Sequence, residues 1–135
     1  MRNKLLLAAC CLFGMVVSTH AQAGGVRVRV PFQFEFGSKV LPAGEYLVWS
    51  EHSLILLRAA GGKELVMVQA NHADPEGGKT ARVVFHCYER RCYLSKFWNP
   101  ETEIAREAAK SKAESELARR GEMQVFALLG EPSAK

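Results

Sequence analysis

Cys87 and Cys92 are the residues whose type and spacing most directly suggest chemistry. They flank Tyr88-Glu89-Arg90-Arg91 near the tip of an expected hairpin. A two-residue turn at Glu89-Arg90 would place Cys87 directly opposite Cys92, where Cα atoms about 4.5–5.5 Å apart are within reach of a disulfide. We therefore predict a structural disulfide. A redox-active pair is disfavoured because the spacing is not Cys-x-x-Cys and no helix N-terminus follows. Zinc would need two further ligands from scattered histidines.

Three histidines, His52, His72 and His86, could take part in a metal site or act as a general base. The acidic residues near them in sequence are Glu51, Asp74 and Glu76. No pair has the spacing that puts both side chains on one face of a helix. A hydrolase would require two of the histidines to converge with a carboxylate in one cleft, but histidines scattered over turns and strand ends fit the pattern equally well. We therefore predict no catalytic residue, no metal ligand and no cofactor.

The segment from Ala73 to Thr80 matches a loose form of the phosphate-binding loop, with Ala in place of its first Gly. Such a loop works because its amides and the N-terminus of a following helix point at phosphate. Here the next residues, Arg82–Phe85, are typical of a strand, so we interpret the segment as a surface loop. Serine catalysis is also disfavoured, because Ser50, Ser53 and Ser95 have no Gly-x-Ser-x-Gly context.

The clearest element that could position these residues is Val26–Phe36. Apolar side chains occupy every even position, while Arg27 and Arg29 are among the side chains at odd positions. Because side chains alternate along a strand, one face should be buried and the other solvated. Pro31 should divide the strand into two segments joined by a bend, and it favours a place at a sheet edge.

Turn signals recur every eight to twelve residues as far as Trp98, which predicts a series of short strands. We expect them at residues 45–51, 54–58, 64–70, 82–88, 92–98 and 124–129. Asn99-Pro100-Glu101 is typical of a helix start and Arg119-Arg120-Gly121 of a helix end, which predicts a helix over residues 100–120. The sequence thus indicates a mostly β fold, a small antiparallel β-sandwich or barrel of six to seven strands with one C-terminal α-helix.

Residues 1–23 are typical of a cleaved secretory signal peptide. Arg2 and Lys4 precede an apolar run from Leu5 to Val17, and Ala21-Gln22-Ala23 provides a cleavage site after Ala23. Lipid attachment at Cys10 would leave too short an apolar run for export. We expect residues 24–130 to form one β-rich domain and residues 131–135 a disordered tail. Export to the periplasm or the medium, an oxidising compartment, suits the predicted disulfide.

The charge of the mature chain is modest. Without Arg2 and Lys4 it has 16 basic and 14 acidic residues, a net charge of +2. No cluster of Lys and Arg resembles the footprint of a nucleic-acid-binding protein, and no further apolar run is long enough to span a membrane.

Three stretches resemble a family of small exported bacterial β-rich proteins with no known activity. They are Val30-Pro31-Phe32-Gln33-Phe34 with Leu41-Pro42-Ala43-Gly44-Glu45-Tyr46, then Phe85-His86-Cys87-Tyr88 with Tyr93-Leu94-Ser95-Lys96-Phe97-Trp98, and Ser111-Lys112-Ala113-Glu114-Ser115-Glu116-Leu117. The resemblance implies a secreted, mostly β domain with a C-terminal helix, and it brings no catalytic residues. The cysteine pair is not part of the shared pattern.

These observations favour an exported, non-enzymatic structural or interaction domain, with an envelope protein as one kind of partner. The alternative is a β-barrel that binds a small apolar ligand such as a lipid, or a carbohydrate, with the apolar face of Val26–Phe36 lining an empty cavity. Aromatic side chains that could line such a pocket are Tyr46, Trp49, Tyr88, Tyr93 and Trp98, although aromatics in a domain of this size are usually core residues or cross-strand pairs. A hydrolase is the least favoured interpretation.

Overall fold

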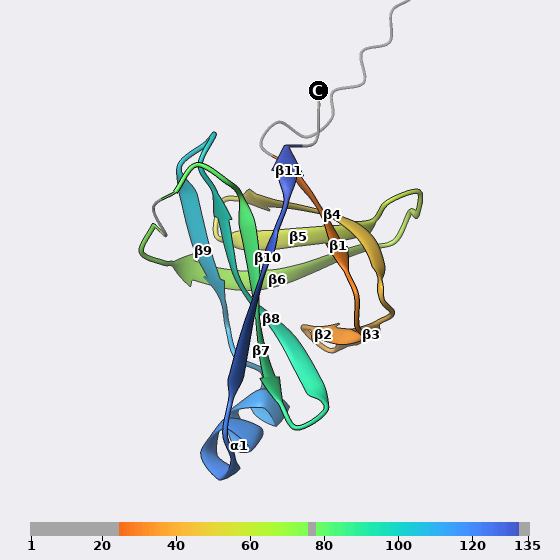
Figure 1. Cartoon of the computed structure of the whole chain (residues 1–135), viewed down its shortest axis with the longest axis vertical. Helices are drawn as coiled ribbons and strands as arrows, with labels where there is room; N and C mark the ends of the chain where they lie inside the picture. The colour runs from red at the N-terminus through yellow and green to blue at the C-terminus, as the bar shows by residue number, and fades with distance from the viewer. Residues whose placement is uncertain (1–24, 76–77, 133–135) are drawn as a thin grey trace, which may run out of the picture.

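The computed structural model describes residues 25–75 and 78–132, which form eleven strands and one helix (Figure 1). The elements are β1 (Val26–Val30), β2 (Phe34–Phe36), β3 (Lys39–Leu41), β4 (Gly44–Glu51), β5 (Leu54–Ala59), β6 (Leu65–His72), β7 (Arg82–Tyr88), β8 (Arg91–Asn99), β9 (Ile104–Ala108), α1 (Lys112–Arg120), β10 (Gln124–Leu129) and β11 (Glu131–Pro132). The mostly β class is confirmed. The expected number of six to seven strands is wrong, because Pro31 splits the first strand and the short strands β3, β9 and β11 come in addition. None of the described helices is long and apolar enough to cross a membrane.

The strands form one open, mixed sheet with the order β10-β7-β8-β9-β6-β5-β4-β1-β11. All ladders are antiparallel except the pairing of β2 with β8, which is parallel. The long strand β6 pairs with β5 through Leu65–Gln69 and with β9 through Ala70–His72. One strand therefore joins the two halves, which is why the structure is a single sheet rather than a sandwich of two.

The two ends of this sheet are β10 and β11, which are neighbours in the chain. β11 pairs with β1 at Val26 and Arg27, while β10 pairs with β7. Figure 1 shows β1 and β10 running apart below β11, so the sheet is not closed into a barrel. Gly130 makes the junction possible. Its N–H donates to the carbonyl of Ala81 at 2.9 Å, and a Cβ at this position would lie 2.4 Å from Val26 Cγ1.

The core is built around the face predicted for Val26–Phe36. The even-numbered residues of β1 and β2 are at most 2 % exposed, and Pro31 separates the two strands as predicted. The ring of Phe34 lies edge-on to Tyr46 and to Phe85, with centroids 5.2 and 5.3 Å apart. These contacts fill the inside of the curved sheet with aromatic side chains from β2, β4 and β7.

The predicted helix over residues 100–120 is wrong in its first half. The Asn99 side chain accepts a hydrogen bond from the N–H of Glu101 at 3.0 Å, so it closes a turn instead of starting a helix. Glu103, with a φ of 57°, completes that turn. Ile104–Ala108 then forms β9 between β8 and β6, where ladder hydrogen bonds on both edges outweigh its helix propensity.

The true start of α1 is at Ser111, whose side chain accepts from the N–H of Glu114 at 3.1 Å. Its predicted end is confirmed, since the N–H of Gly121 donates to the carbonyl of Leu117 at 3.2 Å. The tail predicted for residues 131–135 is wrong at its first two positions, which form β11. Residues 133–135 lie outside the described part of the chain.

Candidate functional site: an exposed apolar edge strand

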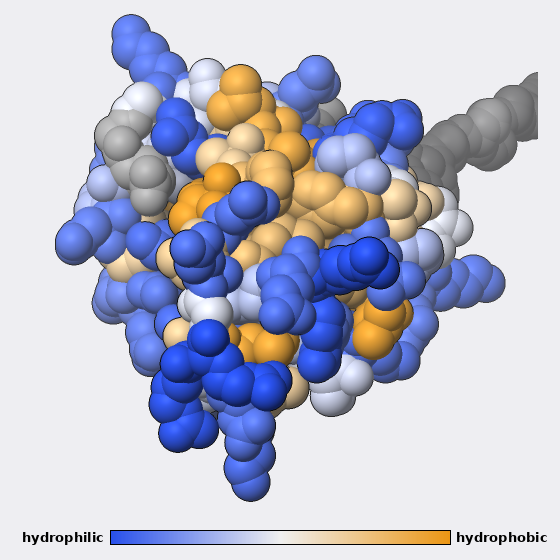
Figure 2. Space-filling model, turned by 60° about the horizontal axis from the view of Figure 1, so that its bottom comes forward, coloured by the Kyte–Doolittle hydropathy of each residue, from blue (hydrophilic) through white to orange (hydrophobic). Residues whose placement is uncertain are grey.

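The most distinctive surface feature is β10. Four large apolar side chains in and next to this strand are exposed, and we call them the β10 strip: Met123 (44 %), Val125 (55 %), Phe126 (42 %) and Leu129 (64 %). Figure 2 shows a broad patch of apolar side chains on one face of the molecule, bordered by hydrophilic ones. No charged residue interrupts the chain between Glu122 and Glu131. Contiguous apolar surface of this kind commonly marks an interaction site.

One edge of β10 has no strand partner among the described residues. The strand pairs with β7 from Gln124 to Leu129, opposite Cys87 to Arg82. Its other edge faces the opening between β10 and β1. An unpaired strand edge presents a row of main-chain N–H and C=O groups that can pair with another chain.

Contacts with the core hold the strip in place. The ring of Phe126 lies 5.8 Å from that of Phe32, which in turn meets Phe85 edge-on at 5.2 Å. The strip is therefore the outer end of the aromatic core, and Gly130 fixes its far end against β1. The sequence predicted a strand at 124–129 but not its exposure. A run apolar at five consecutive positions, 125–129, is typical of a strand covered on both faces. The run signals that both faces need a cover, but not that the strand is exposed.

The helix α1 is attached to the sheet by a buried polar contact. Glu114, 5 % exposed, accepts a hydrogen bond of 3.0 Å from the Tyr88 hydroxyl. Burial raises the pKa of Glu114, an effect that the Tyr88 hydrogen bond partly offsets. Burial and then the hydrogen bond to Glu114 raise the pKa of Tyr88 to about 12. The neighbouring Ala113 on the same helix is exposed. The Ser-x-x-Glu pattern at Ser111–Glu114 was the available signal.

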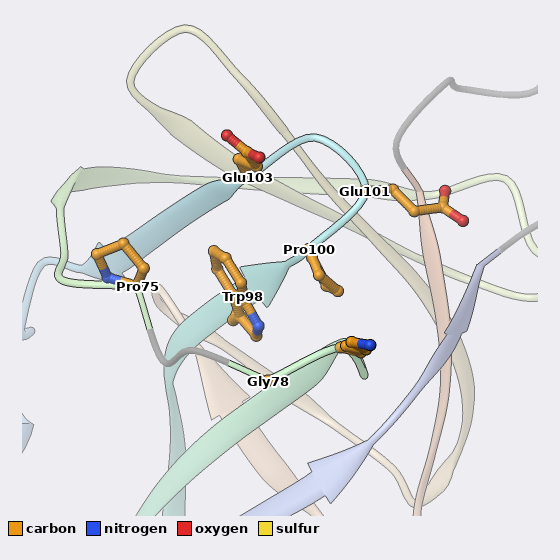
Figure 3. Close-up of a pocket in the computed structure, with 7 residues that line it drawn as sticks. Pro75, Gly78, Trp98, Pro100, Glu101 and Glu103 are labelled. Carbon is orange, nitrogen blue, oxygen red and sulfur yellow. The ribbon is translucent and has the colours of Figure 1, made fainter.

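A surface pocket of about 560 Å³ lies beside the turn between β8 and β9 (Figure 3). Its described lining residues are Pro75, Gly78, Lys79, Trp98, Pro100, Glu101 and Glu103. Trp98 lies between the two prolines, and its buried indole N–H has no hydrogen-bond partner among the residues that the structure describes. The described residues of the Ala73–Thr80 segment form a loop that runs into β7, so the helix that a phosphate-binding loop needs is missing there.

The register predicted for the cysteine pair is confirmed. Cys87 lies directly opposite Cys92 and Tyr88 opposite Arg91, with Glu89 in the turn at a φ of 59°. The cysteine Cα atoms are 3.9 Å apart and the side chains are joined by a disulfide. Cys87 belongs to the buried core, so the bridge ties the tip of the β7–β8 hairpin to the interior of the sheet.

Two of the three histidines come close to Arg106, on β9. The guanidinium donates to the main-chain carbonyl of His52 at 3.1 and 3.3 Å, and to Nδ1 of His72 at 3.0 Å. His52 takes part only through its main-chain carbonyl. The contacts of Arg106 therefore link β9 to the turn between β4 and β5 and to the end of β6. His86 lies apart on β7, facing Tyr93 and Val125 across the neighbouring strands. Burial, followed by Lys110 and Lys96, lowers the pKa of His86.

These histidines form no metal-binding cluster with acids or cysteines in the described ranges 25–75 and 78–132. Glu76 and Ala23, named above for a possible site and for signal cleavage, lie outside those ranges. Of the serines, Ser50 donates to the carbonyl of Leu54 at 3.0 Å and Ser95 is buried.

The aromatics suggested for a ligand pocket are not brought together. Tyr46 is in the core and donates to the carbonyl of Pro42 at 2.5 Å. Trp49 donates to Glu51 at 3.1 Å, while Tyr88 and Tyr93 pair across β7 and β8 with centroids 6.0 Å apart. Tyr46 therefore serves as a core residue and Tyr88 with Tyr93 as a cross-strand pair, and Trp98 alone of the five lines the surface pocket described above.

Comparison with known proteins found no family model, no curated protein and no solved structure that matches this chain.

Proposed function

We propose that this chain is an exported, non-enzymatic interaction domain that binds its partner along β10. The observation that carries the proposal is the β10 strip, a strand that is apolar on both faces, exposed on both, and unpaired along one edge within the described residues. An extended partner segment would gain main-chain hydrogen bonds along the edge and cover the apolar side chains beside it.

The expected gain from covering the strip is substantial. Fully burying a Val, Leu, Phe or Met side chain stabilises by about 1.5–3 kcal/mol, and four such side chains are here roughly half exposed. Association must first offset the loss of translational and rotational freedom, which costs on the order of 4–15 kcal/mol. Covering the exposed half of these four side chains therefore gains about 3–6 kcal/mol, which only offsets the lower end of that cost. The edge hydrogen bonds and the partner's own apolar surface must supply the rest.

We do not propose the ligand-carrying barrel. That function requires an empty cavity beside the apolar face of Val26–Phe36. In the described structure this face is packed, with Phe34 against Tyr46 and Phe85, and the pocket beside Trp98 lies elsewhere on the surface.

The test uses an edge-blocking charge and a matched control. Val125→Lys places a cation on the strip, whereas Met67→Lys places one on β6, and both native side chains are 55 % exposed. Tagged mature chain would be used to capture partners from the envelope of cells that produce it. Val125→Lys should lose a partner that the native chain and Met67→Lys both retain. Identical capture by all three proteins, or no captured partner of any kind, a second untagged copy of this chain included, would contradict the proposal.

Export is a separate part of the proposal, and the disulfide supports it. Cleavage after Ala23 would leave Gly24 as the first residue of the exported protein. N-terminal sequencing of protein recovered outside the cytoplasm should therefore begin at Gly24. An intact N-terminus, or protein confined to the cytoplasm, would contradict this part alone.

A further inference from the structure

Resting on the function proposed above, we infer that the occupant of the β10 edge is a second copy of this chain, whose β10 runs antiparallel to the first about a twofold axis near Val125. The β10 strip is self-complementary. A twofold interface places the same patch on both partners, and the patch from Met123 to Leu129 carries no charge. Pairing it with itself covers apolar side chains with apolar side chains and buries no ion.

Charge at the two ends of the strip selects the antiparallel direction. Arg119 and Arg120 end α1 just before the strip, and Glu122 follows them, which leaves one net positive charge there. Glu131 lies just beyond the other end. Antiparallel pairing brings the basic end of each copy toward Glu131 of the other, whereas parallel pairing sets like charges against each other.

The shape of the opening places the axis near Val125. Toward Gly130 the edge of β10 is closed off by β1, since Val26 and Arg27 pair with β11 and leave no room even for a Cβ on Gly130. The edge is most accessible toward Gln124, where β1 has run away from β10 (Figure 1). A second strand therefore fits beside the first half of β10. The net charge of +2 expected for the mature chain gives little repulsion between copies.

Oligomeric state is the direct test. The mature protein, with its disulfide intact, would be measured by sedimentation velocity over a series of concentrations. A monomer–dimer equilibrium is expected. Val125→Lys sets two cations against each other at the axis and should raise the dissociation constant at least about tenfold, equivalent to about 1.4 kcal/mol, while Met67→Lys should leave it unchanged. A native chain that stays monomeric throughout would overturn the inference.

Cross-linking tests the geometry in a variant that keeps an apolar side chain at the axis. Val125→Cys adds one thiol to a chain whose other mature cysteines are already joined. Mild oxidation should give a covalent dimer, whereas Met67→Cys, equally exposed in the native side chain, should give none. If the Val125→Cys protein dimerises but oxidation does not cross-link it, the antiparallel pairing is overturned. If capture finds a strip-dependent partner of another kind while the chain stays monomeric, the second copy is excluded and the proposed function stands.

Discussion

The contact between Tyr88 and Glu114 should decide whether α1 stays on the sheet. Both side chains are buried, 2 % and 5 % exposed, and their oxygens are 3.0 Å apart. Glu114→Ala removes the acceptor and leaves the Tyr88 hydroxyl buried without a partner. Leaving a buried polar group unpaired costs about 1–3 kcal/mol. Glu114→Gln keeps an acceptor oxygen at nearly the same volume, so its cost should be smaller.

The pH dependence of this contact has a definite sign. Burial raises the pKa of Glu114 in the folded protein above its ordinary value of 4.5. The unfolded chain has the ordinary pKa and the folded chain has the raised one. At a pH between the two, the folded chain binds more protons than the unfolded chain, so the free energy of unfolding falls as pH rises. The contribution of Glu114 is therefore complete below pH 4.5 and is lost as pH rises through the pKa of the folded state. Glu114→Gln has no carboxyl group and should lack this slope.

The measurement is urea unfolding followed by tryptophan fluorescence, from below pH 4.5 to neutral pH, for the native chain and both variants. Glu116→Ala is the control, because Glu116 is an exposed acid on the same helix. Substitutions at such surface positions usually change stability by less than about 0.5 kcal/mol. If Glu114→Ala costs no more than Glu116→Ala, or if Glu114→Gln keeps the slope of the native chain, the assigned role of Glu114 is refuted.

Two further predictions concern Gly130, at the junction of β10 and β11, and the disulfide in the β7–β8 hairpin. Gly130→Ala should destabilise the fold by about 1–3 kcal/mol in urea unfolding, because its Cβ would lie 2.4 Å from Val26 Cγ1, whereas Gly121→Ala meets nothing within 4 Å and should have little effect. Equal losses would contradict the close approach. Replacing Cys87 and Cys92 with Ser should lower the free energy of unfolding by roughly 2 kcal/mol for the six-residue loop. Unreduced exported protein should show no free thiol by mass spectrometry, and alkylation at both cysteines would refute the bridge.

The elements that the sequence predicted well are those determined by local chemistry. Alternation located the buried face of β1 and β2, and Pro31 marked the break between them. The cysteine register followed from the assumed two-residue turn. The helix start at Asn99 failed because Asn followed by Pro caps a turn as readily as a helix, and only the neighbouring edges of β8 and β6 decide which forms. Pairing between distant strands is not encoded in a short sequence window.

The position of the β10 strand was predictable from the sequence, but the exposure of its side chains was not. The run at 124–129 indicated a strand, and apolar side chains at five consecutive positions are typical of a strand that is covered on both faces. Burial in a sheet depends on which strands and layers lie alongside, and here β10 is the first strand in the sheet order. The apolar residues of β10 therefore require a cover on both faces, and the described residues do not provide it. The missing cover is visible only in the structure.

A comparison of two edges within the molecule shows why the exposure of β10 points to a partner. The β2–β3 corner is held by charges, with Lys39 bound to Glu64 and with Arg91 forming a two-pronged contact to Glu35 at 2.8 and 3.0 Å. Charged side chains at an edge discourage pairing with other chains. Between Glu122 and Glu131 β10 has no such protection, and it has neither a proline nor a shift in its register with β7. A chain that carries charged pairs beside one edge and leaves the other apolar and uncharged is suited to pairing along the open one, as proposed above.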